Sequence, residues 1–217
     1  PAEPLFRSRD VEITGNASNI EVKESNNDDI KVLVYDDYDK STTKVTDNKL
    51  SIISKTKKCK FFCLNKKISK IELYLPKTFD KELNITSNYG SINVSNFANM
   101  TLNTTSNLGD INVGTIKKAN TTIDCGDIDI DEVNDINIAS NLGDIKINKV
   151  NEVLNIKEDA GNVKIKSLNL TKSSKINIDT GDVKIDKTNE IYIDAKTDVG
   201  DVKINNNLSI FLLLKTL

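Results

Sequence analysis

Aliphatic and polar residues alternate along most of the chain from about residue 83 to residue 207. The alternation is strict in short runs such as Ile145–Ile147, Val163–Ile165 and Val183–Ile185. A period of two places every second side chain on one face of a strand, and the alternating residues are largely β-branched, as strands prefer. The pattern therefore predicts an all-β protein, in which each run is a strand with one buried face.

These strands recur at a nearly constant interval. Each run follows a glycine in the pattern glycine–polar–aliphatic–polar–aliphatic, and a second alternating run, such as Leu154–Ile156, precedes the glycine. Successive glycines lie 17 to 20 residues apart. We interpret them as structural corners, where φ is positive or no space is left for a Cβ atom. The seven corner glycines are Gly90, Gly109, Gly126, Gly143, Gly161, Gly181 and Gly200.

A repeat of this length is typical of one lap of a solenoid. Equivalent strands of successive laps would then stack in parallel, about 4.8 Å apart. The near-identical segments SNLGDINV and SNLGDIKI lie 34 residues apart, and the period of two within them excludes a helical repeat. The sequence predicts a single-chain parallel β-solenoid of about seven laps, with the right-handed winding that parallel crossovers prefer.

The two ends of the chain depart from the repeat. Residues 1–82 contain strand-like runs separated by polar loops, and no linker rich in proline, glycine or serine divides them from the repeats. We therefore expect an N-terminal antiparallel β cap, continuous with a solenoid over residues 83–207. The final residues, 208–217, read LSIFLLLKTL and are expected to form a capping strand, or an apolar edge through which the chain self-associates.

Composition lowers the expectation of catalysis. The chain has 217 residues, a formal net charge of −2 and no histidine, so the commonest general base and metal ligand is missing. The laps differ in length by only three residues, so no enlarged loops build a cleft. We expect no catalytic residue, metal or cofactor. The mixed charges and sparse aromatic residues also disfavour nucleic-acid binding.

The three cysteines form no even disulfide framework. Cys59 and Cys63 share strand parity, and the sequence leaves open whether they pair. Cys125 follows an isoleucine by two residues, as Ser140 and Thr180 do, so we expect it in an inward-facing column of small residues. Too few suitable ligands are present to favour a zinc site.

A stripe of lysines is one candidate binding feature. In the last four laps, the third residue after the corner glycine is lysine, and it lies beside a mostly acidic column that directly follows the glycine. This stripe is either a solvated face or a surface for a repetitive anionic polymer of the cell wall. Its members are Lys146, Lys164, Lys184 and Lys203.

The segment KKCKFFCLNKK, residues 57–67, is a second candidate. Five lysines surround two phenylalanines and a leucine at what reads as a hairpin tip. Such a loop suits the surface of an anionic membrane, although its aromatic side chains could instead pack back onto the cap. The residues concerned are Lys57, Lys58, Lys60, Phe61, Phe62, Leu64, Lys66 and Lys67.

The motifs resemble those of a known family. The stretch IELYLPKTFDKELNITSNYGSINV, residues 71–94, followed by SNLGDI and DTGDVKI units, is similar to the bacterial putative-adhesin family of unknown function, a LiaG-like group also called the toastrack domain. The resemblance spans nearly the whole chain. It implies an all-β repeat fold, often outside the cytoplasmic membrane behind a signal or membrane segment, and no established catalytic residues.

Two functions are favoured as hypotheses. The first is a non-catalytic binding or structural module of the bacterial cell envelope, with a cell-wall glycan or an anionic membrane surface as its partner. The alternative is a scaffold that self-assembles through residues 208–217. A polysaccharide-processing enzyme is a weaker third possibility. The chain opens on PAEP and has no apolar run of about 20 residues, so we expect its signal or anchor to lie outside this sequence.

Overall fold

The computed structural model describes residues 10–35, 39–46, 49–56, 68–189 and 193–205. The lysine-rich segment 57–67, with Cys59 and Cys63, lies outside these residues, as does the C-terminal segment 208–217. The expectations of a membrane-contact loop and of a capping or self-associating C-terminus therefore stay predictions.

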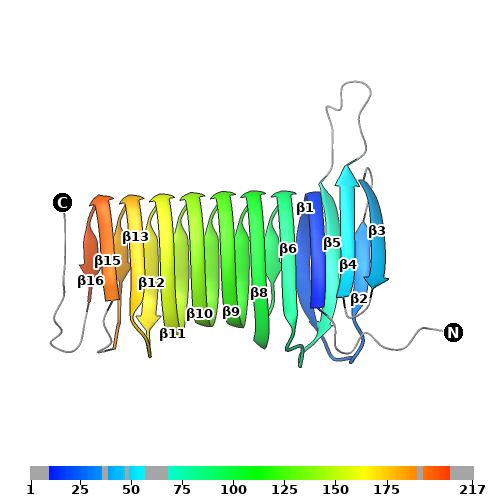
Figure 1. Ribbon diagram of the computed structural model, residues 1–217, viewed down its shortest axis with the longest axis horizontal. Helices are drawn as coiled ribbons and strands as arrows, with labels where there is room; N and C mark the ends of the chain where they lie inside the picture. The colour runs from blue at the N-terminus through cyan, green and yellow to red at the C-terminus, as the bar shows by residue number, and fades with distance from the viewer. Residues whose placement is uncertain (1–9, 36–38, 47–48, 57–67, 190–192, 206–217) are drawn as a thin grey trace, which may run out of the picture.

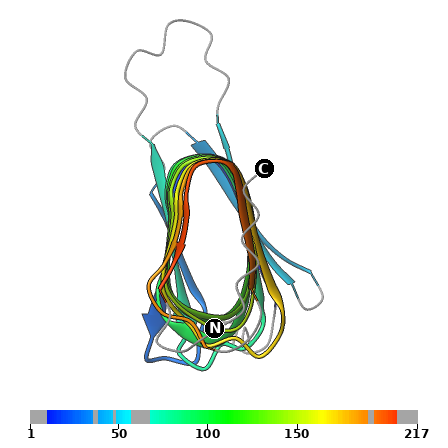
Figure 2. The ribbon, with the colours of Figure 1, turned by 90° about the vertical axis from the view of Figure 1, so that its left-hand side faces the viewer.

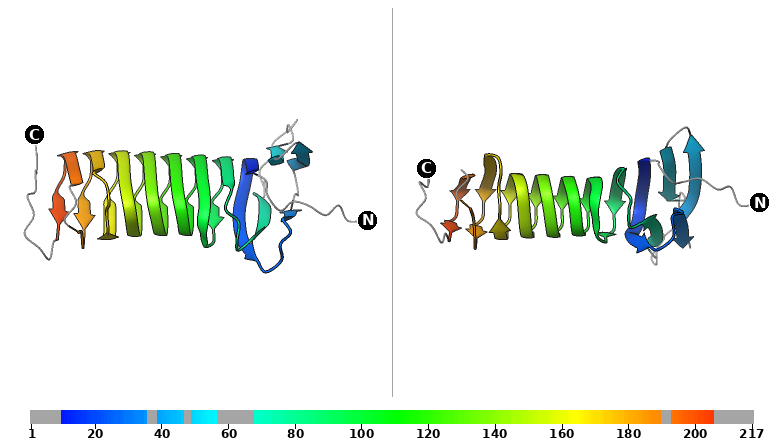
Figure 3. Two further views of the ribbon diagram at one scale, coloured as in Figure 1. Left: turned by 60° about the horizontal axis from the view of Figure 1, so that its bottom comes forward. Right: turned by 90° about the horizontal axis from the view of Figure 1, so that it is seen from below.

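All secondary structure in the described ranges is β, and sixteen strands form one connected sheet. Figure 1 shows the laps side by side in a straight row, and Figure 3 shows strands β2, β3 and β4 gathered at the N-terminal end of that row. The strands are β1 (Asp10–Ser25), β2 (Lys31–Tyr35), β3 (Asp39–Thr46), β4 (Lys49–Thr56), β5 (Ser69–Pro76), β6 (Glu82–Tyr89), β7 (Ile92–Val94), β8 (Phe97–Leu108), β9 (Ile111–Cys125), β10 (Ile128–Leu142), β11 (Ile145–Ala160), β12 (Val163–Leu168), β13 (Ser174–Thr180), β14 (Val183–Ile185), β15 (Ile193–Val199) and β16 (Val202–Ile204).

Equivalent positions of successive laps lie directly beside one another. Ile128 pairs with Ile111 of the preceding lap and with Ile145 of the following lap, both in parallel register. Seen along its axis, the stack is a flattened ring with two long faces (Figure 2). The all-β parallel solenoid expected from the repeat is confirmed.

Aliphatic side chains fill the inside of the ring. Ile111, Ile128, Ile145, Val163 and Val183 stack in one inward column, and none of them is more than 1% exposed. Burial of apolar surface is the main favourable term in folding. Because each lap covers its side chains only with those of its neighbours, the core is a continuous column and no lap is stable alone.

Strand β1 belongs to the parallel stack. It pairs in parallel with β4 and β5 on one side and with β6 and β7 on the other. Antiparallel pairing occurs further out, between β2 and β5 and between β3 and β4. Parallel stacking thus begins at residue 10, ahead of the expected solenoid boundary at residue 83. The repeat motif does not reveal this lap because Ser18, rather than glycine, lies at its corner, beside Gly90.

The expected position of Cys125 is wrong. Its register partners are Leu108 and Leu142, whereas Ser140 pairs with Ile123. Cys125 is a free thiol that is partly exposed at the outer corner. Inward and outward positions stop alternating at the corner. The residue directly before the glycine therefore does not face inward, although it lies two residues after an inward-facing isoleucine.

The corner glycines have both properties expected of them. Gly109 and Gly126 have φ values of 131° and 144°, which L side chains rarely adopt. A Cβ atom on Gly126 would lie 2.5 Å from the carbonyl oxygen of Gly109 in the preceding lap. The corner therefore needs glycine both for its backbone conformation and for the close approach of the next lap.

We predict that Gly126→Ala lowers the free energy of unfolding by about 2 kcal/mol or more, because strained φ values and overpacking each cost about 1–3 kcal/mol. Chemical denaturation followed by far-UV circular dichroism measures the loss. Gly15→Ala is the matched control, since Gly15 has an ordinary φ and a Cβ atom there would come no closer than 3.2 Å to any atom, the Cβ of Ser18. Equal losses in the two variants would contradict the explanation.

Candidate functional site

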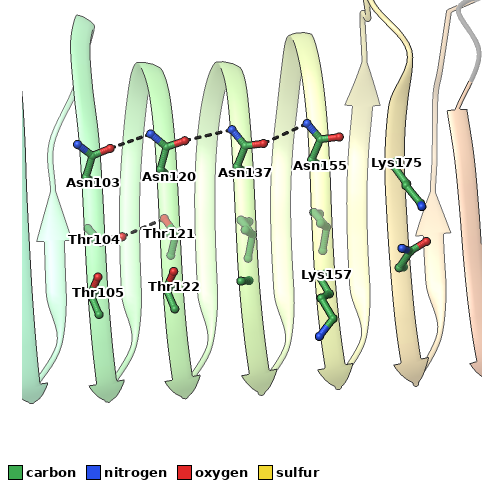
Figure 4. A pocket seen from close by; sticks show the side chains of 14 residues that line it. Asn103, Thr104, Thr105, Asn120, Thr121, Thr122, Asn137, Asn155, Lys157 and Lys175 are labelled. Carbon is green, nitrogen blue, oxygen red and sulfur yellow. Dashed lines mark hydrogen bonds between the residues drawn. The ribbon is translucent and has the colours of Figure 1, made fainter.

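An asparagine ladder runs along the long face that precedes the corner glycines. From Asn103 to Asn155, the side-chain amide nitrogen donates a hydrogen bond to the amide oxygen of the asparagine one lap before it, and Figure 4 shows the three bonds that join Asn103, Asn120, Asn137 and Asn155. Each amide keeps a second N–H and a second lone pair for other partners. The bonded pairs, donor first, are Asn103–Asn84 (2.9 Å), Asn120–Asn103 (2.7 Å), Asn137–Asn120 (3.1 Å) and Asn155–Asn137 (3.0 Å).

The ladder borders an open groove of about 480 Å³. Two residues further along each strand, the outward side chains are small: Thr105, Thr122 and Ala139 are exposed and in register. Lys157 on β11 and Lys175 on β13 also line the groove (Figure 4). Because its residues come from β8, β9, β10, β11 and β13, the groove crosses the laps and follows the axis of the solenoid.

The chemistry of the groove is mostly neutral. Amides, hydroxyls and methyl groups repeat at each lap, and the described residues that line it include neither a carboxylate nor a thiol. Beneath the surface, the hydroxyl of Thr104 donates a 2.9 Å hydrogen bond to that of Thr121 and holds two laps in register. The groove can donate and accept hydrogen bonds at regular steps, but its described lining provides no acid–base pair.

The predicted lysine stripe lies on the opposite long face. Its four members stack in register and are exposed. Lys146 forms a 2.6 Å ion pair with Asp129, which raises the lysine pKa, and Lys184 forms one of 3.4 Å with Asp186. A second open groove, of about 520 Å³, includes Asp129, Asp131 and Lys146 in its lining. Side chains of both charges therefore lie on this face.

The acidic column after the glycines has a structural role that the repeat pattern had not indicated. In each lap a side-chain oxygen of this column accepts a hydrogen bond from the backbone N–H of the equivalent residue in the next lap. The recurrence of aspartate or asparagine at one position was the available signal, since short side chains of this kind can reach a neighbouring backbone amide. The pairs, donor first, are Asp127–Asp110 (3.0 Å), Asp144–Asp127 (2.9 Å), Asn162–Asp144 (2.9 Å), Asp182–Asn162 (3.0 Å) and Asp201–Asp182 (2.9 Å).

Glu158 carries an ionisable group into the core, and the sequence reasoning missed it. The side chain is fully buried in the inward column between Ser140 and Ile178. The Ser140 hydroxyl donates a 3.1 Å hydrogen bond to Glu158 Oε1, and Oε2 has no partner among the described residues. Burial raises the pKa of Glu158 to about 7. Strict alternation after Ile156 would have placed residue 158 inside.

A second carboxylate has the opposite environment. Glu72 on β5 accepts hydrogen bonds from the ammonium groups of Lys23 and Lys70 at 2.8 Å and from the Tyr74 hydroxyl at 3.0 Å. These partners, the two lysines first, lower the pKa of Glu72 to about 2. The cluster holds β5 against β1 and stays ionised at neutral pH, so Glu72 has no proton to donate there.

The described residues hold neither a metal-binding cluster nor a membrane-spanning helix. No group of three or more cysteine or acidic side chains among them could hold a metal ion. Within the same ranges, no helix has the length and apolar character needed to cross a membrane.

The sequence profile of the Toastrack DUF4097 family matches residues 8–210. The chain belongs to this family. The match confirms the family expected from the glycine–aspartate repeats and the segment 71–94. Comparison with curated proteins gave no match.

The chain is similar to several solved structures. A protein of Bacteroides fragilis NCTC 9343 described as "a putative adhesin" has a TM-score of 0.59 and 17% identity, with 92% of each chain covered. A "putative lipid binding protein" of Parabacteroides distasonis ATCC 8503 has a TM-score of 0.47 and 20% identity, and the match covers 91% of this chain and 94% of that chain. A "putative cell adhesion protein" of Clostridium sporogenes ATCC 15579 has a TM-score of 0.35 and 13% identity, and the match covers 93% of each chain. At 17% identity, the similarity to the first of these shows the fold alone.

We predict that the free energy of unfolding of this toastrack domain falls by about 3 kcal/mol as pH rises from about 4.5 to 7. In this window folded Glu158, with a pKa of about 7, keeps a proton that the unfolded chain, at its usual 4.5, releases. The chain has no histidine, and Glu72 titrates lower, so few other groups contribute. Denaturation at pH 5 and pH 8 measures the difference.

Glu158→Gln should remove most of this pH dependence, because the amide has a similar shape and does not ionise. The matched control is Glu132→Gln. Glu132 is paired with Lys149 at 2.8 Å and its pKa is lowered, so this variant should keep the dependence between pH 5 and pH 8. An unchanged dependence in Glu158→Gln would show that another group is responsible.

Proposed function

We propose that this protein is a non-catalytic binding module of the bacterial cell envelope, and that the asparagine groove binds an extended, hydroxyl-rich polymer such as a cell-wall glycan. The observation that carries the proposal is the groove itself, in which neutral amide and hydroxyl groups repeat along the solenoid axis over five neighbouring strands.

The ladder prepares these amides for binding. Each asparagine from Asn103 to Asn155 is already held by a hydrogen bond to its neighbour, so less side-chain freedom is lost when a ligand binds. The free N–H and lone pair of each amide suit sugar hydroxyls, which both donate and accept. The methyl groups of Thr105, Thr122 and Ala139 offer small apolar patches to the C–H groups of a sugar ring.

Repetition would supply affinity that a single lap lacks. A polymer that runs along the groove meets a similar set of groups at each lap, and linked weak contacts add through high effective concentration. Cleavage of a glycan by hydrolysis generally needs two carboxylates about 5–10 Å apart, and the described lining has none. The chemistry therefore favours binding without turnover.

The envelope location rests on the family resemblance and on the fold shared with the Bacteroides fragilis protein described as "a putative adhesin". The lysine stripe supports a second candidate, an anionic wall polymer. Lys164 and Lys203 have no ion-pair partner among the described residues, and they stack in register with Lys184. The stripe and the asparagine groove lie on opposite faces, so substitution can separate the two.

We predict that Ala139→Trp weakens binding to soluble cell-wall glycans about tenfold or more, a loss of about 1.4 kcal/mol, because the indole fills the groove. Ala139 is exposed between Thr122 and Lys157, so the ladder stays intact. Affinity electrophoresis in gels containing the glycan measures retention. Lys164→Trp, the same residue introduced on the opposite face, is the matched control.

Thermal melting of both variants should match that of the wild type. If Lys164→Trp abolishes retention in the glycan gel and Ala139→Trp does not, the lysine stripe is the binding site. That result would overturn the proposal that the asparagine groove binds the glycan. No retention of the wild-type protein by any envelope glycan, neutral or anionic, would overturn the proposed function as a whole.

A further inference from the structure

The most exposed large apolar side chains of the repeats lie in one column. Tyr89, Leu108, Leu142 and Val199 are 54%, 50%, 53% and 65% exposed, and each directly precedes a corner glycine. Among the described residues from 83 onward, no other large hydrophobic side chain is classed as exposed. Exposed apolar residues are normally scattered singly over a surface, so their concentration at one repeat position needs an explanation.

The column is continuous from lap to lap. Each member pairs in register with the next, and the arrowheads of β8 to β11 in Figure 4 end at this column. Seven positions at a strand spacing of about 4.8 Å make a line about 30 Å long. We call this column the apolar crest after its four large apolar side chains. The smaller residues Cys125, Ala160 and Thr180 lie in register between them, so that the members in order are Tyr89, Leu108, Cys125, Leu142, Ala160, Thr180 and Val199.

Acidic residues flank the crest on both sides. Neither the column before it nor the column that follows the corner glycines contains a lysine or arginine. In the column after it, one carboxylate oxygen bonds a backbone amide and the other remains for a partner. The acids are Asp124, Asp159, Asp179 and Asp198 before the crest, and Asp110, Asp127, Asp144, Asp182 and Asp201 after it.

Packing between laps does not account for the crest. Leu108 and Leu142 are in register with Cys125, yet each leaves half of its surface in water. The outward columns on the two long faces instead hold polar or small side chains. The folded domain therefore leaves apolar surface uncovered between two columns that are rich in aspartate.

We propose that the apolar crest is a docking surface for a basic amphipathic protein segment, one that presents a line of apolar side chains with lysine or arginine on both sides. Charge complementarity selects this occupant, because two rows of carboxylates would attract such a segment from a distance and orient it along the crest. The same rows would repel an anionic membrane, and they would repel the identical crest of a second copy.

The partner's cations can bind without dismantling the corner. Asp159 Oδ1 is paired with Lys157 at 3.3 Å, whereas no hydrogen bond or ion pair within the described ranges holds the carboxylates of Asp179 and Asp198, so these two remain available to a partner. The apolar side chains of the partner would cover those of the crest. The interface would thus combine apolar burial along its centre with a charged rim, and its affinity would fall with salt.

The test uses a fluorescein-labelled peptide of leucine and lysine, patterned as an amphipathic helix, and fluorescence anisotropy with the full chain. The peptide should bind the wild type, more weakly at high salt, and Leu108→Ser with Leu142→Ser should weaken binding about tenfold or more. Val45→Ser with Ile68→Ser is the matched control, because these residues are also exposed but lie outside the crest. A leucine–glutamate peptide should not bind.

Each other outcome overturns the proposal. Equal binding by the crest and control variants would assign the peptide to another acidic surface. If the wild type self-associates in analytical ultracentrifugation and only the crest variant does not, the occupant of the crest is a second copy of the chain. If the wild type binds phosphatidylglycerol vesicles and only the crest variant does not, the occupant is a membrane. Retention in glycan gels should not change in the crest variant, so failure here is distinguishable from failure of the proposed function.

Discussion

The structure depends on the close approach of successive laps at the corner. There each glycine from Gly109 to Gly200 lies against the carbonyl of the glycine one lap before, with no space for a Cβ atom. The aspartate or asparagine that follows accepts the next backbone amide, so the corner is closed by hydrogen bonds from one lap to the next. Because every lap is held at the same height and register, the side chains of the long strands are forced into columns.

Columns turn a short repeat into surfaces of uniform chemistry. One outward position becomes the asparagine ladder, another becomes the lysine stripe, and the residue before the glycine becomes the apolar crest. Inside the ring the same rule stacks aliphatic side chains and leaves them almost fully buried. The residue type at one position of the repeat therefore sets the chemistry of a line about 30 Å long.

The outward surfaces differ in chemistry. The asparagine groove is mostly neutral, the opposite face carries both signs of charge, and the corner between them combines apolar side chains with carboxylates. Glu158 is the exception inside the ring, where a buried carboxyl with one unpartnered oxygen interrupts an otherwise apolar or hydroxyl-lined column. Its raised pKa makes the stability of the core sensitive to pH in a chain without histidine.

The sequence by itself determined the architecture and the family, because the period of two and the recurring glycines are local signals. Counting from the glycines also placed the four lysines of the stripe in one column, but tertiary structure decided which positions share a column before the corner. It placed β1 in the parallel stack through pairing with residues about 72 positions away, turned Cys125 outward, and joined Asn103 to Asn120 across a lap. It also set Glu158 against Ser140 in the core. The register between laps depends on how the backbone closes at each corner. Because the corner interrupts the alternation of apolar and polar residues, the sequence pattern alone does not predict that register.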